Sequence, residues 1–243
     1  MRCKLTIEYD GTGFSGWQRQ KRGRTVQGEI EQAMAVFFRR EIPVYGQGRT
    51  DRGVHAVGQV AHADLPDGTE ELRLLSAMRG LLPPDIAVVR VQPAAQDFHA
   101  RFDALSRRYR YQMAIRPAPL YRHACWVMLK PFDSKLLNEC AKMISGDHDF
   151  SNFAKIPDDS SLSSRCVIRT SHWSNDDYLW CYTIEGNRFL RHMVRRLVGT
   201  MLQVATGDFG KNDFKALLNG GEAAGRKGHA APPEGLVLEN VSY

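Results

Sequence analysis

Long hydrophobic runs are missing from this chain of 243 residues. No apolar stretch approaches the roughly 18 residues that a membrane-spanning helix requires. The amino terminus, MRCKLTIEYDG, enters an alternating strand pattern directly, with no hydrophobic signal segment before it. We therefore expect a soluble protein of the cytoplasm, without a membrane partner.

Cysteine is also scarce, and its placement argues against two classes of site. The five cysteines are odd in number and widely separated, and no two of them form a CxxC pair. A zinc site and a secreted disulfide framework are both disfavoured by this spacing. We expect buried free thiols instead, at Cys3, Cys125, Cys140, Cys166 and Cys181.

No compositional bias marks the chain as disordered, collagen-like or coiled-coil, since 43% of residues are hydrophobic and 25% are charged. The length suits one large domain or two small ones. A chain of this size buries about 70–75% of its extended surface and needs no metal or disulfide to fold.

Charge is unevenly distributed. The formal balance is 33 − 27 = +6. Residues 1–122 hold 19 basic and 13 acidic side chains, whereas residues 123–243 hold 14 of each. Arginine outnumbers lysine 24 to 9, which suits a nucleic-acid partner because the guanidinium pairs bidentately with phosphate. A GC-rich genome would give the same arginine bias without functional meaning.

The order of predicted elements in the first half is β-α-β-β-α-β, the split βαβ pattern of ferredoxin-like folds. Cys3, Leu5, Ile7 and Tyr9 alternate on one face of the first strand. Thr25 is the expected N-cap of the first helix. The predicted elements are strand 3–9, helix 25–40, strands 42–46 and 57–64, helix 70–82 and strand 86–92.

The second half repeats this order without repeating the sequence. Asp133 is the expected N-cap of its first helix, and an Asn175-Asp176-Asp177 turn is expected between two strands. The predicted elements are strand 105–115, helix 134–145, strands 166–173 and 178–186, helices 188–206 and 213–219, and a final strand within 235–243. Loops are expected at 10–24, 153–164 and 220–234.

These patterns predict an α+β fold with two ferredoxin-like halves, residues 1–104 and 105–243. We expect their antiparallel sheets to join into one extended sheet, with an active-site cleft between the halves.

The segment GQGRTDRGVHA (46–56) has the highest density of candidate catalytic residues. Three glycines in eight residues indicate tight turns or close approach of a ligand. Its only carboxylate, Asp51, is flanked by Arg49 and Arg52, whose charges favour an ionised aspartate that can act as nucleophile or base. An aspartate in an Asx-turn with two solvated arginines is the alternative. The segment is not a phosphate-binding Walker A loop.

His55 in this segment and His62 and Asp64 after it could in principle form a metal site, but this is the less favoured interpretation. No HExxH motif is present, and zinc ligands usually have tighter spacing. We expect histidines that do not bind metal.

The strand LSRRYRYQMAI (105–115) places Tyr109 and Tyr111 on one face and Arg108 and Arg110 on the other. Tyrosines beside arginines can stack on an unpaired base. Tyr111 is more simply a core residue, and for Tyr109 both readings stay open.

Three arginines are expected in the first two turns of helix 188–206, at Arg188, Arg191 and Arg195. Basic residues are mildly unfavourable near a helix N-terminus. Such a local cost suggests that they face a phosphate or a carboxylate.

Seven segments, in order along nearly the whole chain, resemble the bacterial tRNA pseudouridine synthases of the TruA type. They are YDGTGFSGWQRQ (9–20), TVQGEIEQA (25–33), GRTDRGVHAVGQVAH (48–62), DFHARFDALSRRYRY (97–111), HDFSNF (148–153), FLRHMVRRLVGTML (189–202) and APPEGLVLENVSY (231–243).

The resemblance implies an isomerase that converts uridine to pseudouridine at positions 38, 39 and 40 of tRNA, as a homodimer and with no cofactor or metal. It implies that Asp51 is the nucleophile, Tyr109 its catalytic partner and Arg195 the arginine that pairs with the aspartate. It also implies that Arg49 helps to displace the target base. The implied RNA contacts are Phe98, His99, Ala100, Arg101, Phe102, Tyr109 and Arg165.

The chain departs from the family pattern at three places: Gln47, where alanine is usual, Arg52, and the stretch AKIPDDSSLSSR (154–165). Two other readings stay open. One is a non-catalytic protein with two RRM-like halves, although neither half has the aromatic RNP1 pattern. The other is a metal-dependent hydrolase built on Asp51, His55 and His62.

Overall fold

The computed structural model describes residues 1–155, 163–220 and 229–243. Residues 156–162 and 221–228, which belong to two of the expected loops, lie outside the described residues. Contacts divide the chain into two compact units: residues 1–105 with 237–243, and residues 106–236. The α+β class is confirmed, because each unit combines a sheet with helices. Across the described ranges, no helix has the length and apolar character to cross a membrane.

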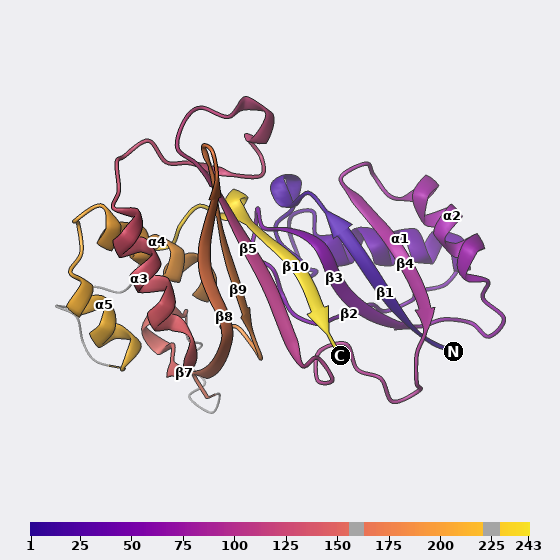
Figure 1. Ribbon diagram of the computed structural model, residues 1–243. Helices are drawn as coiled ribbons and strands as arrows, with labels where there is room; N and C mark the ends of the chain where they lie inside the picture. Colours follow the sequence, from indigo (N-terminus) through magenta and orange to yellow (C-terminus); the bar gives the residue numbers. More distant parts are fainter. Residues whose placement is uncertain (156–162, 221–228) are drawn as a thin grey trace. The chain divides into compact units, whose positions relative to one another are not determined.

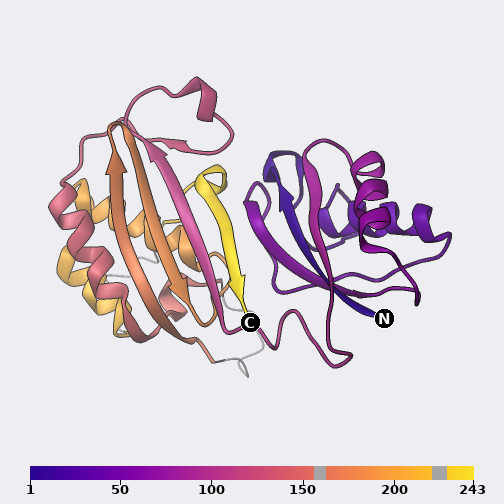
Figure 2. The same ribbon diagram turned by 45° about the vertical axis from the view of Figure 1, so that its right-hand side comes forward.

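Unit 1 is built around strand β1 (Arg2–Tyr9), which pairs antiparallel with β3 (His55–Asp64) on one side and β4 (Ile86–Pro93) on the other. Helices α1 (Val26–Phe38) and α2 (Glu71–Leu81) lie on one side of these strands (Figure 2). The alternation expected for the first strand is confirmed, since Cys3, Leu5, Ile7 and Tyr9 are all buried. Thr25 caps α1 as expected, and its hydroxyl accepts a hydrogen bond from the Gly28 N–H.

The free edge of β3 is shared by two short pairings. β2 (Tyr45–Gly46) pairs antiparallel with Ala61 and His62. β10 (Leu236–Ser242), the last strand of the chain, pairs parallel with His55 and Ala56. The strand predicted over 42–46 is therefore only two residues long.

Unit 2 has the strand order β5-β9-β8-β7, and all of these neighbours are antiparallel. Figure 1 shows its helices on one face of this sheet. Asp133 caps the first of them by accepting hydrogen bonds from the N–H groups of Lys135 and Leu136. The elements are β5 (Ser106–Ala114), β6 (Trp126–Val127), α3 (Ser134–Ile144), β7 (Gly146–Asp149), β8 (Arg165–Asp176), β9 (Leu179–Gly186), α4 (Met193–Ala205) and α5 (Lys211–Leu218).

The helix predicted over 188–206 is wrong at its start, since α4 begins at Met193. The preceding backbone is held by other partners: Asn187 N–H donates to Val167 O, and Arg191 O accepts from Lys155 N–H. His192, at the N-cap, has a positive φ of 65°. Arg188 and Arg191 therefore precede the helix, and only Arg195 lies in its first turn.

Three smaller differences concern unit 2. The turn between β8 and β9 is centred on Asp177 and Tyr178, one residue later than expected, and Asp177 has a positive φ of 51°. The two strands β6 and β7 were not predicted, because they are only two and four residues long. Four cysteines are buried thiols as expected, whereas Cys181 is half-buried.

Candidate active site

Asp51 lies in the turn that joins β2 to β3. At the base of the turn, Gln47 N–H donates to Val60 O at 2.8 Å, and the Gln59 side chain donates to Gly48 O at 3.3 Å. Val54 N–H closes the turn on Asp51 O at 3.2 Å. The positive φ of Gly53, 79°, explains why glycine follows Asp51-Arg52 in the sequence. The turn is thus held by backbone hydrogen bonds and by the Gln59 side chain of β3.

Asp51 is half-buried, whereas Arg49 and Arg52 are exposed. The Arg49 guanidinium donates to the side-chain oxygen of Gln18 at 3.2 Å. The motif therefore combines a half-buried aspartate with two exposed cations that flank it in the sequence, and exposed guanidinium groups can bind phosphate oxygens.

The segment 9–17 packs directly against the turn. Trp17 N–H donates to Thr50 O at 3.2 Å, and the Tyr9 and Thr50 hydroxyls share a buried hydrogen bond of 2.8 Å. Gly16 has a φ of 102°, and a Cβ at this position would lie 2.8 Å from Thr50 O. A side chain at Gly16 would therefore push the segment away from the residue before Asp51.

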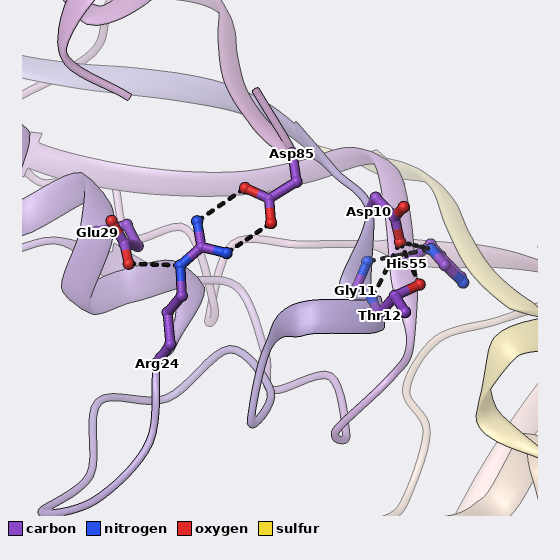
Figure 3. Close-up of polar contacts among 7 residues, drawn as sticks. All are labelled: Asp10, Gly11, Thr12, Arg24, Glu29, His55 and Asp85. Carbon is purple, nitrogen blue, oxygen red and sulfur yellow. Dashed lines mark hydrogen bonds and ion pairs between the residues drawn. The ribbon is translucent and has the colours of Figure 1, made fainter. Parts of the chain in front are cut away.

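His55, at the start of β3, is buried, and its side chain contacts the turn at residues 10–12 (Figure 3). Its Nδ1 accepts a hydrogen bond from Gly11 N–H at 3.1 Å and lies 3.2 Å from the Asp10 carboxylate. Asp10 also accepts from the Thr12 N–H and hydroxyl, at 3.0 and 2.6 Å. Over the described ranges, no three His, Cys, Asp or Glu side chains gather as metal ligands.

Arg24 is a residue that the sequence analysis missed. Its guanidinium binds both oxygens of Asp85 at 2.6 and 2.8 Å and Glu29 at 2.7 Å (Figure 3). It also lies 4.3 Å from the centroid of the Phe14 ring. The hydrogen bonds that Arg24 donates to Asp85 raise the pKa of Arg24 above its ordinary value, against the effect of burial. Arg24 thereby anchors the end of loop 10–24 to the start of β4.

The FHARF segment (98–102) forms a turn in unit 1, after β4. Ala100 is buried, whereas Arg101 and Phe102 are exposed. The ring of His99 contacts that of Phe102, with centroids 4.4 Å apart. The segment thus presents a cation and an aromatic ring to solvent, a combination suited to RNA.

In unit 2, Tyr109 lies on the buried face of β5, opposite Ile184 of β9, and is 9% exposed. Its ring meets Phe189 edge-on, with centroids 5.2 Å apart. Tyr111 is confirmed as a core residue, because it is fully buried and its hydroxyl donates to Pro232 O at 2.9 Å.

Arg195 lies in the first turn of α4 and is partly exposed. Its Nε donates to Ala231 O at 2.8 Å, and Ala231 N–H donates to Arg195 O at 2.9 Å. The segment after 228 therefore fixes the direction of the Arg195 side chain. Arg165, at the start of β8, is exposed and pairs with Asp147 at 3.1 Å.

The structure divides the candidate residues between its two units. Asp51, Arg49 and the FHARF segment belong to unit 1, and Tyr109, Arg165 and Arg195 belong to unit 2. In unit 1, the turn with Asp51 and the FHARF segment lie at different positions along β3, since they adjoin His55 and His62.

Comparison with known proteins gives one consistent result. A family model described as tRNA pseudouridine synthase matches residues 5–103 and 140–243. Among curated proteins, the tRNA pseudouridine synthase A of Solidesulfovibrio magneticus is 39% identical, over all of this chain and 91% of its own length. The proteins of that name from Maricaulis maris and Parabacteroides distasonis are 38% and 36% identical, over 100% and 98% of this chain and 98% and 94% of their own lengths.

Proposed function

The chain belongs to the tRNA pseudouridine synthase family, and on this basis we propose that it isomerises uridine to pseudouridine in tRNA. The target sites that we propose are positions 38, 39 and 40 in the anticodon stem-loop. The observation that carries the proposal is the GRTD turn (48–51), in which the half-buried Asp51 is flanked in the sequence by the exposed Arg49 and Arg52.

The reaction rearranges one nucleoside and needs no oxidant. The N1–C1′ glycosidic bond breaks, the uracil turns, C5 bonds to C1′, and the proton on C5 moves to solvent while N1 gains one. The enzyme must supply a nucleophile, hold the freed uracil and accept the C5 proton. We propose that the chain does so without a cofactor or metal.

In this proposal Asp51 is the nucleophile, attacking the nucleoside at C1′ or C6. The rigid turn described above would spare the carboxylate the entropy cost of finding its position. Arg195 would pair with the Asp51 carboxylate, and the hydrogen bond from its Nε to Ala231 O, which restrains the Arg195 side chain, supports this role.

Tyr109 would stack on the flipped uracil, and its hydroxyl would take part in removal of the C5 proton. The edge-on contact with Phe189 limits rotation of the tyrosine ring. Arg49 would occupy the space left by the target base. Extracting a base from a stack costs a few kcal/mol, which contacts to phosphate elsewhere can offset.

We assign those contacts to residues 98–102 and to Arg165. The exposed Arg101 and Phe102 support the first assignment, because a cation and an exposed aromatic ring bind phosphate and unpaired bases. Arg165 is exposed and pairs with Asp147 at the surface, a pairing weak enough for phosphate to replace.

The decisive experiment maps pseudouridine in bulk tRNA after incubation with the purified protein. We expect new pseudouridine in the anticodon arm with the wild-type protein and none with Asp51→Asn, which retains size and polarity but cannot act as a nucleophile. Asp176→Asn is the matched control, since Asp176 is an exposed carboxylate at the end of β8.

The tRNA affinity of Asp51→Asn should stay within about threefold of wild type, because phosphate contacts dominate binding. Near-normal turnover by Asp51→Asn would refute the assignment of the nucleophile. Binding of tRNA by the wild type without any isomerisation would favour the non-catalytic RNA-binding alternative.

We also propose that the enzyme is a homodimer of the cytoplasm. Sedimentation velocity at micromolar concentration tests the assembly, with a species of twice the chain mass of 27.4 kDa expected. A single species at the monomer mass would contradict it.

A further inference from the structure

His62 is a buried histidine to which the proposed chemistry gives no role. It lies near the end of β3, is 3% exposed, and is opposite Lys4 of β1 and Tyr45 of β2. The Tyr45 ring stacks on the imidazole with centroids 5.1 Å apart and planes 19° apart. His99 packs against it as well, with centroids 4.7 Å apart. The imidazole thus packs against side chains of β2 and of the FHARF segment.

One hydrogen bond connects His62 to the backbone of that segment. Ala100 N–H donates to His62 Nδ1 at 3.1 Å, in a buried position. The carbonyl of the same residue accepts from the Tyr243 hydroxyl at 2.8 Å. Ala100 itself is fully buried. Its N–H and its carbonyl are therefore each held by a side chain from elsewhere in unit 1.

The residues beside Ala100 depend on this anchor. His99 Nδ1 accepts from Arg101 N–H at 3.1 Å, and His99 N–H donates to Asp103 at 2.8 Å. These contacts are local to the turn, whereas the bond to His62 spans 38 residues. Ala100, together with Phe98, whose carbonyl accepts from the Arg2 guanidinium at 3.0 Å, therefore ties the exposed Arg101 and Phe102 to the sheet.

We propose that His62 is a positioning residue for tRNA binding: its Nδ1 acceptor holds Ala100 so that Arg101 and Phe102 face the RNA. This inference rests on the proposed function, in which residues 98–102 contact tRNA. His62 is too buried to touch the RNA itself. Because the segment is already ordered in the free protein, less conformational entropy would be lost when the RNA binds.

The role requires a neutral imidazole with its proton on Nε2. A proton on Nδ1 would set two donors against each other, since Ala100 N–H already points at that atom. The positive charges of His99 in the segment and of Arg2 on β1 disfavour an added positive charge, while Asp64 and Asp103 partly oppose them. Burial is the largest influence, and together these lower the pKa of His62 to about 4. The acceptor therefore persists through the neutral range.

His62 lies far along β3 from the turn that carries the proposed nucleophile. His62 lies seven residues after His55, which adjoins the turn that carries Asp51. At about 3.3 Å per residue, roughly 20 Å of strand separates them. A change at His62 should therefore alter the binding of tRNA and leave the chemical step nearly intact.

The test compares His62→Asn with His62→Gln, two variants that carry the same amide group. The Asn side-chain oxygen can occupy the place of Nδ1, whereas the longer Gln places its amide near Nε2. We expect Gln to raise the KM and Kd for tRNA about five- to a hundredfold, the range for an unsatisfied buried N–H. We expect Asn to stay within about threefold of wild type, and kcat to change less than threefold in both.

Hydrogen exchange at the Ala100 amide gives a second readout, faster in His62→Gln than in His62→Asn. His62→Gln with wild-type KM, Kd and exchange would overturn the proposal, as would equal losses in both variants or a loss confined to kcat. If Gln fails to fold, Tyr243→Phe, which removes the other bond to Ala100, must raise KM without lowering kcat, or the proposal fails. A wild-type enzyme that makes no pseudouridine would instead contradict the proposed function.

Discussion

At the scale of single residues, changes at Tyr109 and at Arg195 should each lower turnover. Tyr109→Phe keeps the ring and its contact with Phe189 and loses only the hydroxyl. We expect kcat to fall about 10²–10⁴-fold, the usual contribution of a general acid or base, while the Kd for tRNA changes less than twofold. Single-turnover kinetics with labelled tRNA would measure the chemical step.

The control for this variant is Tyr178→Phe, at a partly exposed tyrosine of the β8–β9 turn, which should be fully active. Arg195→Ala should also lose turnover, whereas a variant that loses tRNA affinity alone would move Arg195 to the RNA-binding surface. Full activity of Tyr109→Phe would show that a group other than the Tyr109 hydroxyl accepts the C5 proton.

His62 also makes stability depend on pH. Its pKa is lowered from 6.5 to about 4 in the folded protein, first by burial and then by the positive charges of His99 and Arg2. Because the unfolded state binds this proton more tightly, stability falls as pH decreases from 6.5 towards 4. We expect this residue to cost about 2 kcal/mol between pH 7 and pH 5.

Urea unfolding at the two pH values measures this cost. His62→Asn should flatten the difference, while His172→Asn, at an exposed histidine of β8, should leave it unchanged. An equal pH dependence in wild type and His62→Asn would contradict the shift.

The sequence predicts single residues best where a side chain bonds to the backbone a few residues away. Thr25 and Asp133 were identified as helix caps because a capping side chain acts within its own turn. The role of Arg24 was missed because its main partner, Asp85, is 61 residues away. Local patterns contain no information about such a pair.

At the scale of elements, Arg24 determines how loop 10–24 is attached to unit 1. The guanidinium joins α1, through Glu29, to the start of β4, through Asp85. Arg24→Met would remove these bonds and leave two carboxylates close together. We expect a loss of about 1–2 kcal/mol, less than for a buried pair because each of the three side chains is a quarter to a third exposed.

Urea denaturation of Arg24→Met, Asp85→Asn and the double variant measures the coupling. Arg79→Met on α2, an exposed arginine, is the control. Independent, additive effects of the two changes would show that the pair contributes nothing to stability.

Element types were predicted well and element starts less well. The helical spacing of apolar residues in α4 extends back into residues 188–192. The backbone groups of Asn187 and Arg191 nevertheless bond to residues outside a helix, and His192 has a positive φ, so the helix starts later. The parallel pairing of β10 with β3 could not be predicted, because it joins residues about 180 apart in the sequence. The division into halves at 104/105 and the joining of their sheets stay predictions.

At the scale of the whole molecule, the positive charge should make binding depend strongly on salt. The net charge of +6 comes entirely from residues 1–122, and the GRTD turn and the FHARF segment both lie in unit 1. With about 6–10 phosphates neutralised, the affinity for tRNA should fall about 10³–10⁵-fold between 50 and 200 mM salt. The cause is the release of condensed counterions, whose entropy gain shrinks as bulk salt rises.

Single arginines can then be assigned from the slope of log Kd against log salt. Arg101→Ala should reduce that slope by about one, the value of a single phosphate contact, and weaken binding evenly across tRNA sequences. Arg79→Ala, which removes an equally exposed cation from α2, should change neither. Phe102→Ala should lower affinity without altering the slope, because stacking releases no counterions. A flat salt response in the wild type would place the RNA on a surface other than the basic one, and would leave the charge of residues 1–122 without a role in binding.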